Sequence, residues 1–360
     1  MIPQRYSLVP PDTRLAGHDR QVGEKAASMS RGSGASAQEV LDPQVRQFVE
    51  RCSADYAKYG PFDRLPIAEA RQVAEEVRAP WRRGGPAMHS TRELQVPFGA
   101  SSVRIRVYDP GMPAGTAAPR PALIYMHGGG WMIFSLDTHD RVMREYAARS
   151  GLIVIGVDYA LAPEARFPTA LEQVTAVTRW LLAGQGAALG VDPARIVLGG
   201  DSAGGNLAMA ACLGLRDEGS RQHPAVAGLL LNYAGFEPDC SDEAARLYGG
   251  EGFMLTRAEV RNFWAHYLRT AADERDPRAS LARADLKGLP PVRLTIAECD
   301  VLAEQNLQMA RRLKDAAVRV TSRVYPGATH SFLEAVAISQ LAERALQEGA
   351  DWLRALTRMA

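Results

Sequence analysis

The chain has 360 residues, of which 46% are hydrophobic and 23% are charged. This length allows one large or two small domains with a buried core, and the composition excludes a collagen-like, coiled-coil or disordered protein. Lys and Arg number 42 against 41 Asp and Glu, a net charge of +1, so no bulk field attracts nucleic acid or anionic lipid. We therefore expect no nucleic-acid and no membrane partner.

The cysteine pattern argues against a structural metal. The four cysteines, at positions 52, 212, 240 and 299, are far apart and form no CxxC pair. Free thiols fit a reducing compartment, so we expect a cytoplasmic protein. The first 35 residues lack the apolar core of a secretion signal, and no run approaches the roughly 20 apolar residues of a membrane span.

The N-terminal part of the chain precedes the first strand signal. Residues 1–38 are rich in Pro, Gly and Ser, and we expect a flexible arm there with no chemical role. Residues 39–84 then show helical spacing, with Asp42 placed as an N-cap before Pro43 and a second helix over 67–77. We expect 39–84 to form the N-terminal part of a helical cap.

From residue 85 to 360, short β-rich runs alternate with helical patterns. The candidate strands are 94–98, 103–108, 122–126, 152–157, 196–198, 228–232, 292–297 and 318–325. The candidate helices between and after them are 138–149, 168–183, 203–216, 303–316 and 332–357. Runs such as LIVIGV lack alternation, which is typical of strands buried on both faces of a parallel sheet. The predicted class is α/β, with a mostly parallel eight-stranded sheet flanked by helices.

An insertion over 235–270 interrupts this alternation. A helix is expected from Thr256 to Leu268, with Thr256 as N-cap and Glu259 at the third helical position. Its apolar residues recur at helical spacing. We therefore expect 235–270 to be the second part of the cap.

The segment Gly200-Asp201-Ser202-Ala203-Gly204 fits the pattern GxSxG. It lies between an expected strand and an expected helix. A tight turn of small residues at that point lifts the Ser202 hydroxyl clear of the backbone. The pattern alone also fits a glycine-rich phosphate loop or a plain turn, but the strand–turn–helix context favours Ser202 as a nucleophile.

A second glycine-rich segment, His127-Gly128-Gly129-Gly130, directly follows the expected strand ALIYM. Glycines at this place let backbone N–H groups approach an oxyanion closely, and such a loop accompanies the serine turn described above. A plain turn is the alternative. We expect His127 to hold the loop rather than to titrate in catalysis.

A serine nucleophile needs a base, and the base needs an acid to orient it. In chain order serine, acid, histidine, the candidates are Asp300 and His330, each just after an expected strand. Asp300 could instead be only a helix N-cap. Glu298 and Glu304 are rival acids, ranked lower because Glu298 ends a strand and Glu304 lies farther into a helix.

Other histidines compete with His330, namely His18, His89, His139, His223 and His266. Only His330 follows the acid in the required order. His139 lies in the segment Asp137-Thr138-His139-Asp140, which could pass for metal ligands. No third and fourth ligand is suitably spaced, so the first turn of a helix is the better interpretation and no metal is expected.

These motifs together resemble a known family. HGGG, GDSAGG, the segment DYALAPE at 158–164, Asp300 and the ending His330-Ser331-Phe332 are similar to the hormone-sensitive-lipase-like branch of the α/β-hydrolase superfamily, chiefly bacterial carboxylesterases. The resemblance runs from about residue 85 to the end. It implies an α/β-hydrolase fold with a helical cap made from the N-terminal helices and the 235–270 insertion.

Carried over residue by residue, the resemblance implies site roles. Ser202, Asp300 and His330 would form a catalytic triad. The backbones of Gly128, Gly129 and Ala203 would form the oxyanion hole. No cofactor is implied.

Three departures from the family pattern concern the site. The family segment usually reads DYRLAPE, but Ala160 replaces the arginine, so an ion pair from that arginine to Glu164 would be absent. The acid motif, usually DPLxDEG, keeps only parts of its pattern. After HGGG the family often has a glycine where this chain has Phe134.

The segment that carries Phe134 bears on substrate size. We expect Trp131, Met132 and Phe134 to line a substrate pocket and to limit it to short acyl chains. The alternative is that these large apolar residues belong to the core.

The function that these features favour is a cofactor-free serine carboxylesterase acting on a small ester through an acyl-enzyme. Amide, lactone or carbamate hydrolysis with the same triad is an alternative, and a non-catalytic ligand receptor on the same fold is another. The receptors similar to this family have lost the histidine that His330 supplies here. The resemblance also suggests a homodimer through the last strand and helix.

Overall fold

A mixed sheet forms the centre of the computed structural model, which describes residues 36–111, 118–219 and 225–359. The flexible arm expected over 1–38 lies outside these ranges, residues 36–38 aside. The strands are β1 Ser90–Phe98, β2 Ser101–Asp109, β3 Arg120–Met126, β4 Ile153–Asp158, β5 Val191–Asp201, β6 Gly228–Asn232, β7 Val292–Cys299 and β8 Val320–Thr329. Their order across the sheet is β1-β2-β4-β3-β5-β6-β7-β8. The β1–β2 and β2–β4 pairs are antiparallel and the other pairs are parallel, so the mostly parallel eight-stranded sheet is confirmed.

The first strand is longer than its sequence pattern indicates. β1 begins at Ser90 instead of residue 94, and it pairs with β2 from Ser90 opposite Asp109 to Phe98 opposite Ser101. It is an edge strand whose first four residues are polar and at most half-buried. An edge strand can be formed by backbone pairing alone, so apolar alternation did not mark these residues.

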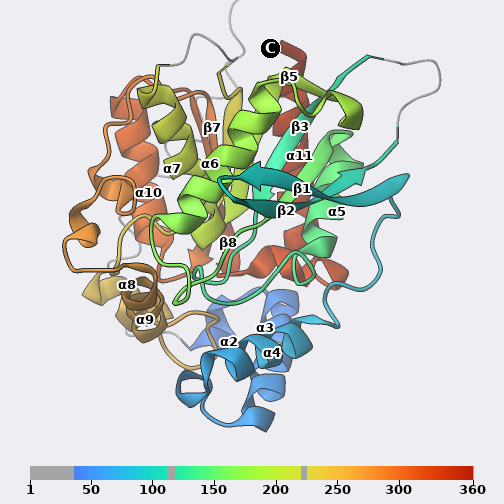
Figure 1. Ribbon diagram of the computed structural model, residues 1–360. Helices are drawn as coiled ribbons and strands as arrows, with labels where there is room; N and C mark the ends of the chain where they lie inside the picture. The colour runs from blue at the N-terminus through green and yellow to red at the C-terminus, as the bar shows by residue number, and fades with distance from the viewer. Residues whose placement is uncertain (1–35, 112–117, 220–224, 360) are drawn as a thin grey trace, which may run out of the picture. The chain divides into compact units, whose positions relative to one another are not determined.

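Helices pack on both faces of the sheet (Figure 1). The α-helices are α2 Ala37–Val40, α3 Pro43–Tyr56, α4 Ile67–Arg78, α5 Asp140–Ser150, α6 Thr169–Leu182, α7 Ala203–Asp217, α8 Asp242–Tyr248, α9 Arg257–Tyr267, α10 Ala303–Asp315 and α11 Gln340–Met359. The 3₁₀ turns are η2 Ala57–Tyr59, η3 Phe62–Arg64, η4 Ala187–Leu189, η5 Asp273–Arg275, η6 Leu281–Arg283 and η7 Phe332–Ala337. Among the described helices, none is both long enough and apolar enough to cross a membrane.

The sheet separates two apolar cores. In β3, Ile124 packs with the core that includes α6, α7 and α10, whereas Leu123 and Tyr125 pack with the core that includes α5 and α11. Successive side chains of a strand point to opposite faces, so a strand covered on both sides needs apolar residues at every position. This explains the unalternated runs from which the class was predicted.

The last helix differs from its prediction. A single helix was expected over 332–357, but η7 and α11 are separate elements with Ile338 and Ser339 between them. The Ser339 hydroxyl accepts a hydrogen bond from the Ala342 N–H at 3.2 Å, as at the start of a new helix. The chain therefore changes direction at Ile338 and Ser339, between η7 and the long helix α11.

The N-terminal helices and the insertion lie at the same end of the sheet (Figure 1). Helix α3 begins as predicted, because Asp42 accepts from the N–H groups of Gln44 and Val45. Helix α9 carries the predicted capping box of Thr256 and Glu259. The short helix α8 was not expected from the sequence.

Helix α3 packs against the C-terminal part of the fold. Val45, Phe48, Val49 and Cys52 lie on one face of α3 and are buried. The helix contacts η7, β8 and α11. The N-terminal helices therefore share a core with the elements on either side of residue 330.

Candidate active site

Ser202 lies at the turn between β5 and α7. Its backbone has φ +53° and ψ −120°, which is strained for a residue with a side chain. The turn is tight enough that a Cβ on Gly204 would lie 2.0 Å from the Met126 carbonyl oxygen. A serine held this way presents its hydroxyl at the end of the strand.

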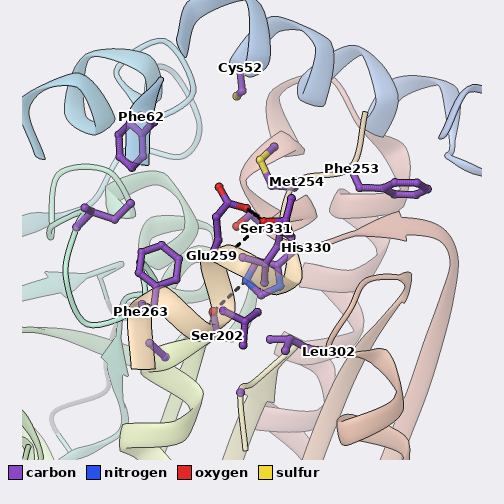
Figure 2. A pocket seen from close by; sticks show the side chains of 18 of the residues that line it. Cys52, Phe62, Ser202, Phe253, Met254, Glu259, Phe263, Leu302, His330 and Ser331 are labelled. Carbon is purple, nitrogen blue, oxygen red and sulfur yellow. Dashed lines mark hydrogen bonds between the residues drawn. The ribbon is translucent and has the colours of Figure 1, made fainter. Parts of the chain in front are cut away.

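A chain of hydrogen bonds joins Ser202, His330 and Asp300. The Ser202 Oγ lies 2.9 Å from Nε2 of His330 (Figure 2). Nδ1 of His330 lies 2.7 Å from Oδ2 of Asp300. The other carboxylate oxygen of Asp300 accepts from the Leu302 N–H at 2.9 Å, which fixes the carboxylate. Asp300 thus contacts the histidine and caps the turn before α10 at the same time. The structure brings together the three side chains predicted from chain order.

The surroundings of His330 favour its protonated form. Burial lowers the pKa of the imidazole, but the charge of Asp300 and its hydrogen bond outweigh burial and raise that pKa above 6.5. The charges of Asp201 and Glu334 act in the same direction. The Asp300 carboxylate, whose side chain is 1% exposed, stabilises an imidazolium at this position.

The rival acids and histidines lie apart from this chain of hydrogen bonds. Glu298 accepts from the Gly327 N–H at 3.0 Å and so supports the turn before His330. Glu304 is exposed and bonds to Gln308. His266 is half-buried and contacts the Asn262 carbonyl oxygen. His89 is exposed, and His18 and His223 lie outside the described residues.

The glycine loop after β3 faces Ser202. Gly129 has φ +107°, and a Cβ there would lie 2.2 Å from the Ile133 carbonyl oxygen, so only glycine fits. Gly129 and Ala203 line the same pocket as Ser202. Among the described residues, no acceptor is found for the N–H of either one. Gly128 is not in that lining; a Cβ on it would lie 2.4 Å from Oδ2 of Asp201.

Asp201, next to the serine, is held in a buried polar network. Its Oδ1 accepts from the Tyr125 hydroxyl at 2.8 Å, and its Oδ2 lies 3.2 Å from Nε2 of His139. Burial raises the pKa of Asp201, but the charge and hydrogen bond of His139 outweigh it and the net pKa is lowered. The ion pair braces the turn that carries Ser202.

His127 holds the glycine loop, as predicted, through its ring. Its Nδ1 lies 2.7 Å from the Gly128 carbonyl oxygen, and the ring stacks on Tyr159 with centroids 4.4 Å apart. Burial, with the nearby charge of His139, lowers the pKa of His127 to about 3. The ring is therefore neutral at ordinary pH. Within the described ranges, no group of His, Cys, Asp and Glu could hold a metal ion.

A pocket of about 450 Å³ opens above Ser202 and His330. Two segments that are distant in the sequence form its far walls (Figure 2). The N-terminal segment contributes Phe62, and the insertion contributes Met254 and Phe263. Phe263 belongs to the amphipathic helix that the sequence indicated. Nothing in the local pattern marked Phe62 or Met254, because Phe62 begins the three-residue 3₁₀ turn η3 and Met254 lies in the loop between α8 and α9.

The three predicted pocket residues have different positions. Trp131 and Phe134 line the pocket, and both have positive φ values, 60° and 71°. The Trp131 ring also stacks on Tyr267 at 4.1 Å. Met132 is not part of the lining and packs instead with Ala74 and Ala162.

The ion pair from an arginine at position 160 is absent, as expected, but Glu164 has another cationic partner. Glu164 pairs with Arg71 of α4, whose Nη2 lies 2.6 Å and Nη1 3.0 Å from its two oxygens. Arg71 also donates to the carbonyl oxygens of Met132 and Ala162, both at 2.8 Å. The guanidinium comes from an N-terminal helix, so the local segment around Ala160 did not show it.

Comparisons with known proteins agree with this geometry. Residues 123–334 match the family model described as alpha/beta hydrolase fold. A hyperthermophilic esterase from the archaeon Pyrobaculum calidifontis is similar with 31% identity and a TM-score of 0.80, over 88% of this chain and 99% of that chain. A thermostable carboxylesterase cloned from a metagenomic library shows 32% identity and a TM-score of 0.76, over 81% of this chain and 98% of that one.

A third solved structure is an ester hydrolase from the metagenome of Lake Arreo, in complex with a bipyridine phosphonate derivative. It is 31% identical with a TM-score of 0.79, over 88% of this chain and 98% of that chain. The match to the family model covers more than half of the 360 residues, and these esterases align over nearly their whole length. The chain belongs to the α/β-hydrolase family, in its hormone-sensitive-lipase-like branch.

Proposed function

We propose that the protein is a serine carboxylesterase that hydrolyses small esters with short acyl chains through an acyl-enzyme. The observation that carries this proposal is the hydrogen-bonded chain from Ser202 through His330 to Asp300 at the base of a pocket. The esterases similar to this chain support the same reaction class.

In the first half-reaction, neutral His330 accepts the Ser202 proton through Nε2 while the serine oxygen attacks the ester carbonyl carbon. The tetrahedral intermediate collapses when the bond to the alcohol oxygen breaks, and His330 donates its proton to that oxygen. In the second half, His330 takes a proton from water, whose oxygen attacks the acyl-enzyme. The acid leaves and Ser202 regains its proton.

Negative charge develops on the carbonyl oxygen in both halves. The N–H groups of Gly129 and Ala203 line the pocket beside Ser202 and lack protein acceptors in the described chain, so they suit this charge. Gly128 would contribute as the third member. Only glycine fits there, because a Cβ on Gly128 would lie 2.4 Å from Oδ2 of Asp201 in the turn that carries the serine.

The N-terminal helices and the 235–270 insertion act as a cap over this site. Both segments contribute walls to the pocket, including Phe62 and Phe263. Phe134 forms a wall near the serine and would stop a growing acyl chain. Burial of a further CH₂ contributes about 0.8 kcal/mol, which is forfeited once the chain meets a wall.

Hydrolysis of amides, lactones or carbamates uses the same groups, so a substrate panel decides between them. We expect p-nitrophenyl butyrate to be hydrolysed faster than the matching anilide or a lactone of similar size. A fluorophosphonate should add once, to Ser202, and Ser202→Ala should lose both the adduct and turnover. An adduct that persists on the alanine variant contradicts the assignment. If the wild-type protein reacts with the fluorophosphonate but hydrolyses none of these substrates, the result favours a ligand receptor.

The reaction should need neither metal nor cofactor. EDTA is expected to leave the turnover of p-nitrophenyl butyrate unchanged. Activity that is lost with EDTA and restored by a divalent metal would contradict the proposed mechanism.

We also propose a homodimer in the cytoplasm. β8 is an edge strand that pairs only with β7 in the described sheet, so its residues before Gly327, whose carbonyl oxygen accepts from the Asp42 N–H, are proposed to pair with a second copy. All four cysteines are buried free thiols, which suits a reducing compartment. Light scattering with size-exclusion chromatography tests the dimer, and a monomer at micromolar concentration would contradict it.

A further inference from the structure

Two arginines of helix α4 reach the two sides of the active site. Arg71 and Arg78 are seven residues apart, two helical turns and about 10 Å along the axis, so they project from the same face. Arg71 contacts the segment after the glycine loop, and Arg78 contacts the segment after His330. No other described helix supplies arginines to both.

Arg78 makes a buried contact with Glu334. Its Nε lies 3.6 Å from Oε2 of Glu334, and the two side chains are 3% and 2% exposed. Among the described residues, neither oxygen of Glu334 has a hydrogen-bond donor. The Arg78 guanidinium also lies over the rings of Phe48 and Phe134, at 5.2 and 5.1 Å from their centroids. A carboxylate buried in this way requires a cation, and Arg78 provides it.

Glu334 is four residues beyond His330, in η7. The strand before this loop and the helix after η7 are each held by one hydrogen bond from the segment before α4. The Asp42 N–H donates to the Gly327 carbonyl oxygen at 2.9 Å, and the Gln44 side chain accepts from the Gln340 N–H at 2.8 Å. The N-terminal segment therefore contacts the elements on both sides of the His330 loop, at Gly327 of β8 and Gln340 of α11.

On the opposite side, Arg71 uses its planar fork in three directions at once. It donates to the carbonyl oxygens of Met132 and Ala162 and to both oxygens of Glu164. The Ala162 N–H in turn donates to the Trp131 carbonyl oxygen at 2.8 Å. This set fixes the peptide groups that immediately follow Gly130.

We propose that helix α4 is a positioning element of the esterase: Arg78, through Glu334, holds the loop that carries His330, and Arg71 holds the segment that follows the oxyanion glycines. The inference rests on the proposed function. A cap that only covered the pocket would change which substrates enter. A cap that positions the reacting groups also sets the turnover number, because small displacements of a base or an oxyanion donor cost much of the rate.

The test measures how substitutions change kcat and KM separately, with p-nitrophenyl butyrate and p-nitrophenyl hexanoate as substrates. The double variant Arg78→Met/Glu334→Leu replaces the buried ion pair by apolar side chains, an exchange that folded proteins often tolerate. We expect kcat and kcat/KM to fall together by roughly tenfold or more on both esters, with KM within about threefold and the melting temperature retained. Arg78→Lys keeps the charge and should retain most of kcat.

Arg71→Met is expected to lower kcat by a smaller factor, since its partner Glu164 is 58% exposed. The matched control is Arg82→Met, because Arg82 also pairs with a carboxylate, that of Asp137 at 3.4 Å, but on the surface. This control should keep kcat within twofold. If the double variant does not fold, Glu334→Gln removes the charge with little change of shape and should lower kcat in the same way.

Several results would overturn the inference. The first is an unchanged kcat in the folded variants. The second is a fall of kcat/KM that comes from a higher KM alone or that affects only the longer ester. The third is an equal fall of kcat in Arg82→Met. A wild-type protein that neither hydrolyses these esters nor reacts with fluorophosphonate at Ser202 would instead remove the proposed function. A wild type that labels and turns over, with variants that also turn over normally, removes only the role of α4.

Discussion

The two sides of the pocket are built in different ways. On the sheet side, Ser202, Asp300 and His330 each follow a strand, and hydrogen bonds of 2.7 and 2.9 Å join them. On the side of the proposed cap, called the cap side below, Phe62 and Met254 come from short segments far apart in the chain. Strand register places the first group, whereas packing between distant segments places the second.

The two sides of the pocket therefore determine different properties of the protein. Backbone pairing in a sheet buried on both faces tolerates little movement, so the sheet side suits chemistry that depends on fixed distances. Side chains from helices and loops can be exchanged with less disturbance, so the cap side suits the choice of substrate. The arginines of α4 cross this division, because they belong to the cap and contact the sheet side.

The largest effect should follow a change on the sheet side. Asp300→Asn keeps the shape but removes the charge that stabilises the imidazolium, and it can hold the wrong tautomer of His330. We expect kcat for p-nitrophenyl butyrate to fall by about 10⁴-fold. Glu304→Gln, which alters an exposed carboxylate nearby, should leave kcat unchanged. The reverse ranking would move the acid to Glu304.

The oxyanion loop should show the next largest effect. In Gly129→Ala the new Cβ would lie 2.2 Å from the Ile133 carbonyl oxygen, so the loop must shift and misplace its N–H group. We expect a loss of about 10² to 10³ in kcat. Gly184→Ala is the control, since Gly184 also has a positive φ, 77°, but its Cβ would meet no atom within 4 Å. Equal losses in both would show a folding defect instead.

The pH profile tests the environment of the base. His330 must be neutral to accept the serine proton, so kcat/KM rises with pH as the imidazole loses its proton. Because Asp300 and neighbouring charges raise the pKa above 6.5, the midpoint should lie above 6.5, with a fall of about tenfold per pH unit well below it. Initial rates at low substrate concentration measure it. A midpoint below 6.5 would show that burial outweighs these charges.

The smallest effect should follow a change of the pocket wall. Phe134→Gly removes a ring that lines the pocket, at a φ of 71° that glycine adopts without strain. The optimum in a p-nitrophenyl acyl series should move to longer chains, by roughly fourfold in kcat/KM for each newly buried CH₂. Met132→Ala, outside the lining, should lower stability without moving the optimum. An unchanged profile in folded Phe134→Gly would exclude Phe134 as the wall.

Much of the sheet side could be predicted from sequence, because its signals are local. Strands buried on both faces show unalternated apolar runs, and the turn around Ser202 requires small residues at fixed spacing. Asp300 and His330 could be chosen because strand ends meet at one edge of a parallel sheet and chain order limits the candidates. Each of these constraints acts over fewer than about ten residues or follows from topology.

The cap side could not be predicted to the same depth. The contacts of Arg71 with Glu164 and of Arg78 with Glu334 join residues 93 and 256 positions apart, and a lone arginine on a helix indicates only a solvated face. The backbone of β1 before Leu94 was missed for a related reason, since edge pairing needs no apolar pattern. Contacts between residues that are distant in the sequence produce no periodic pattern in it, so sequence analysis does not detect them.

The pairing of Glu164 with Arg71 also bears on how this fold can evolve. The family pattern DYRLAPE that this segment resembles has arginine where this chain has Ala160, and the cation beside Glu164 comes from α4. We expect loss of Arg71 to be more harmful with alanine at 160 than in an Ala160→Arg variant, in which the new arginine would supply a cation near Glu164. The N-terminal segment of this chain is thus matched to its residues 158–164 through the Arg71–Glu164 pair. Replacement of that segment by one from a relative should succeed only after the arginine is restored.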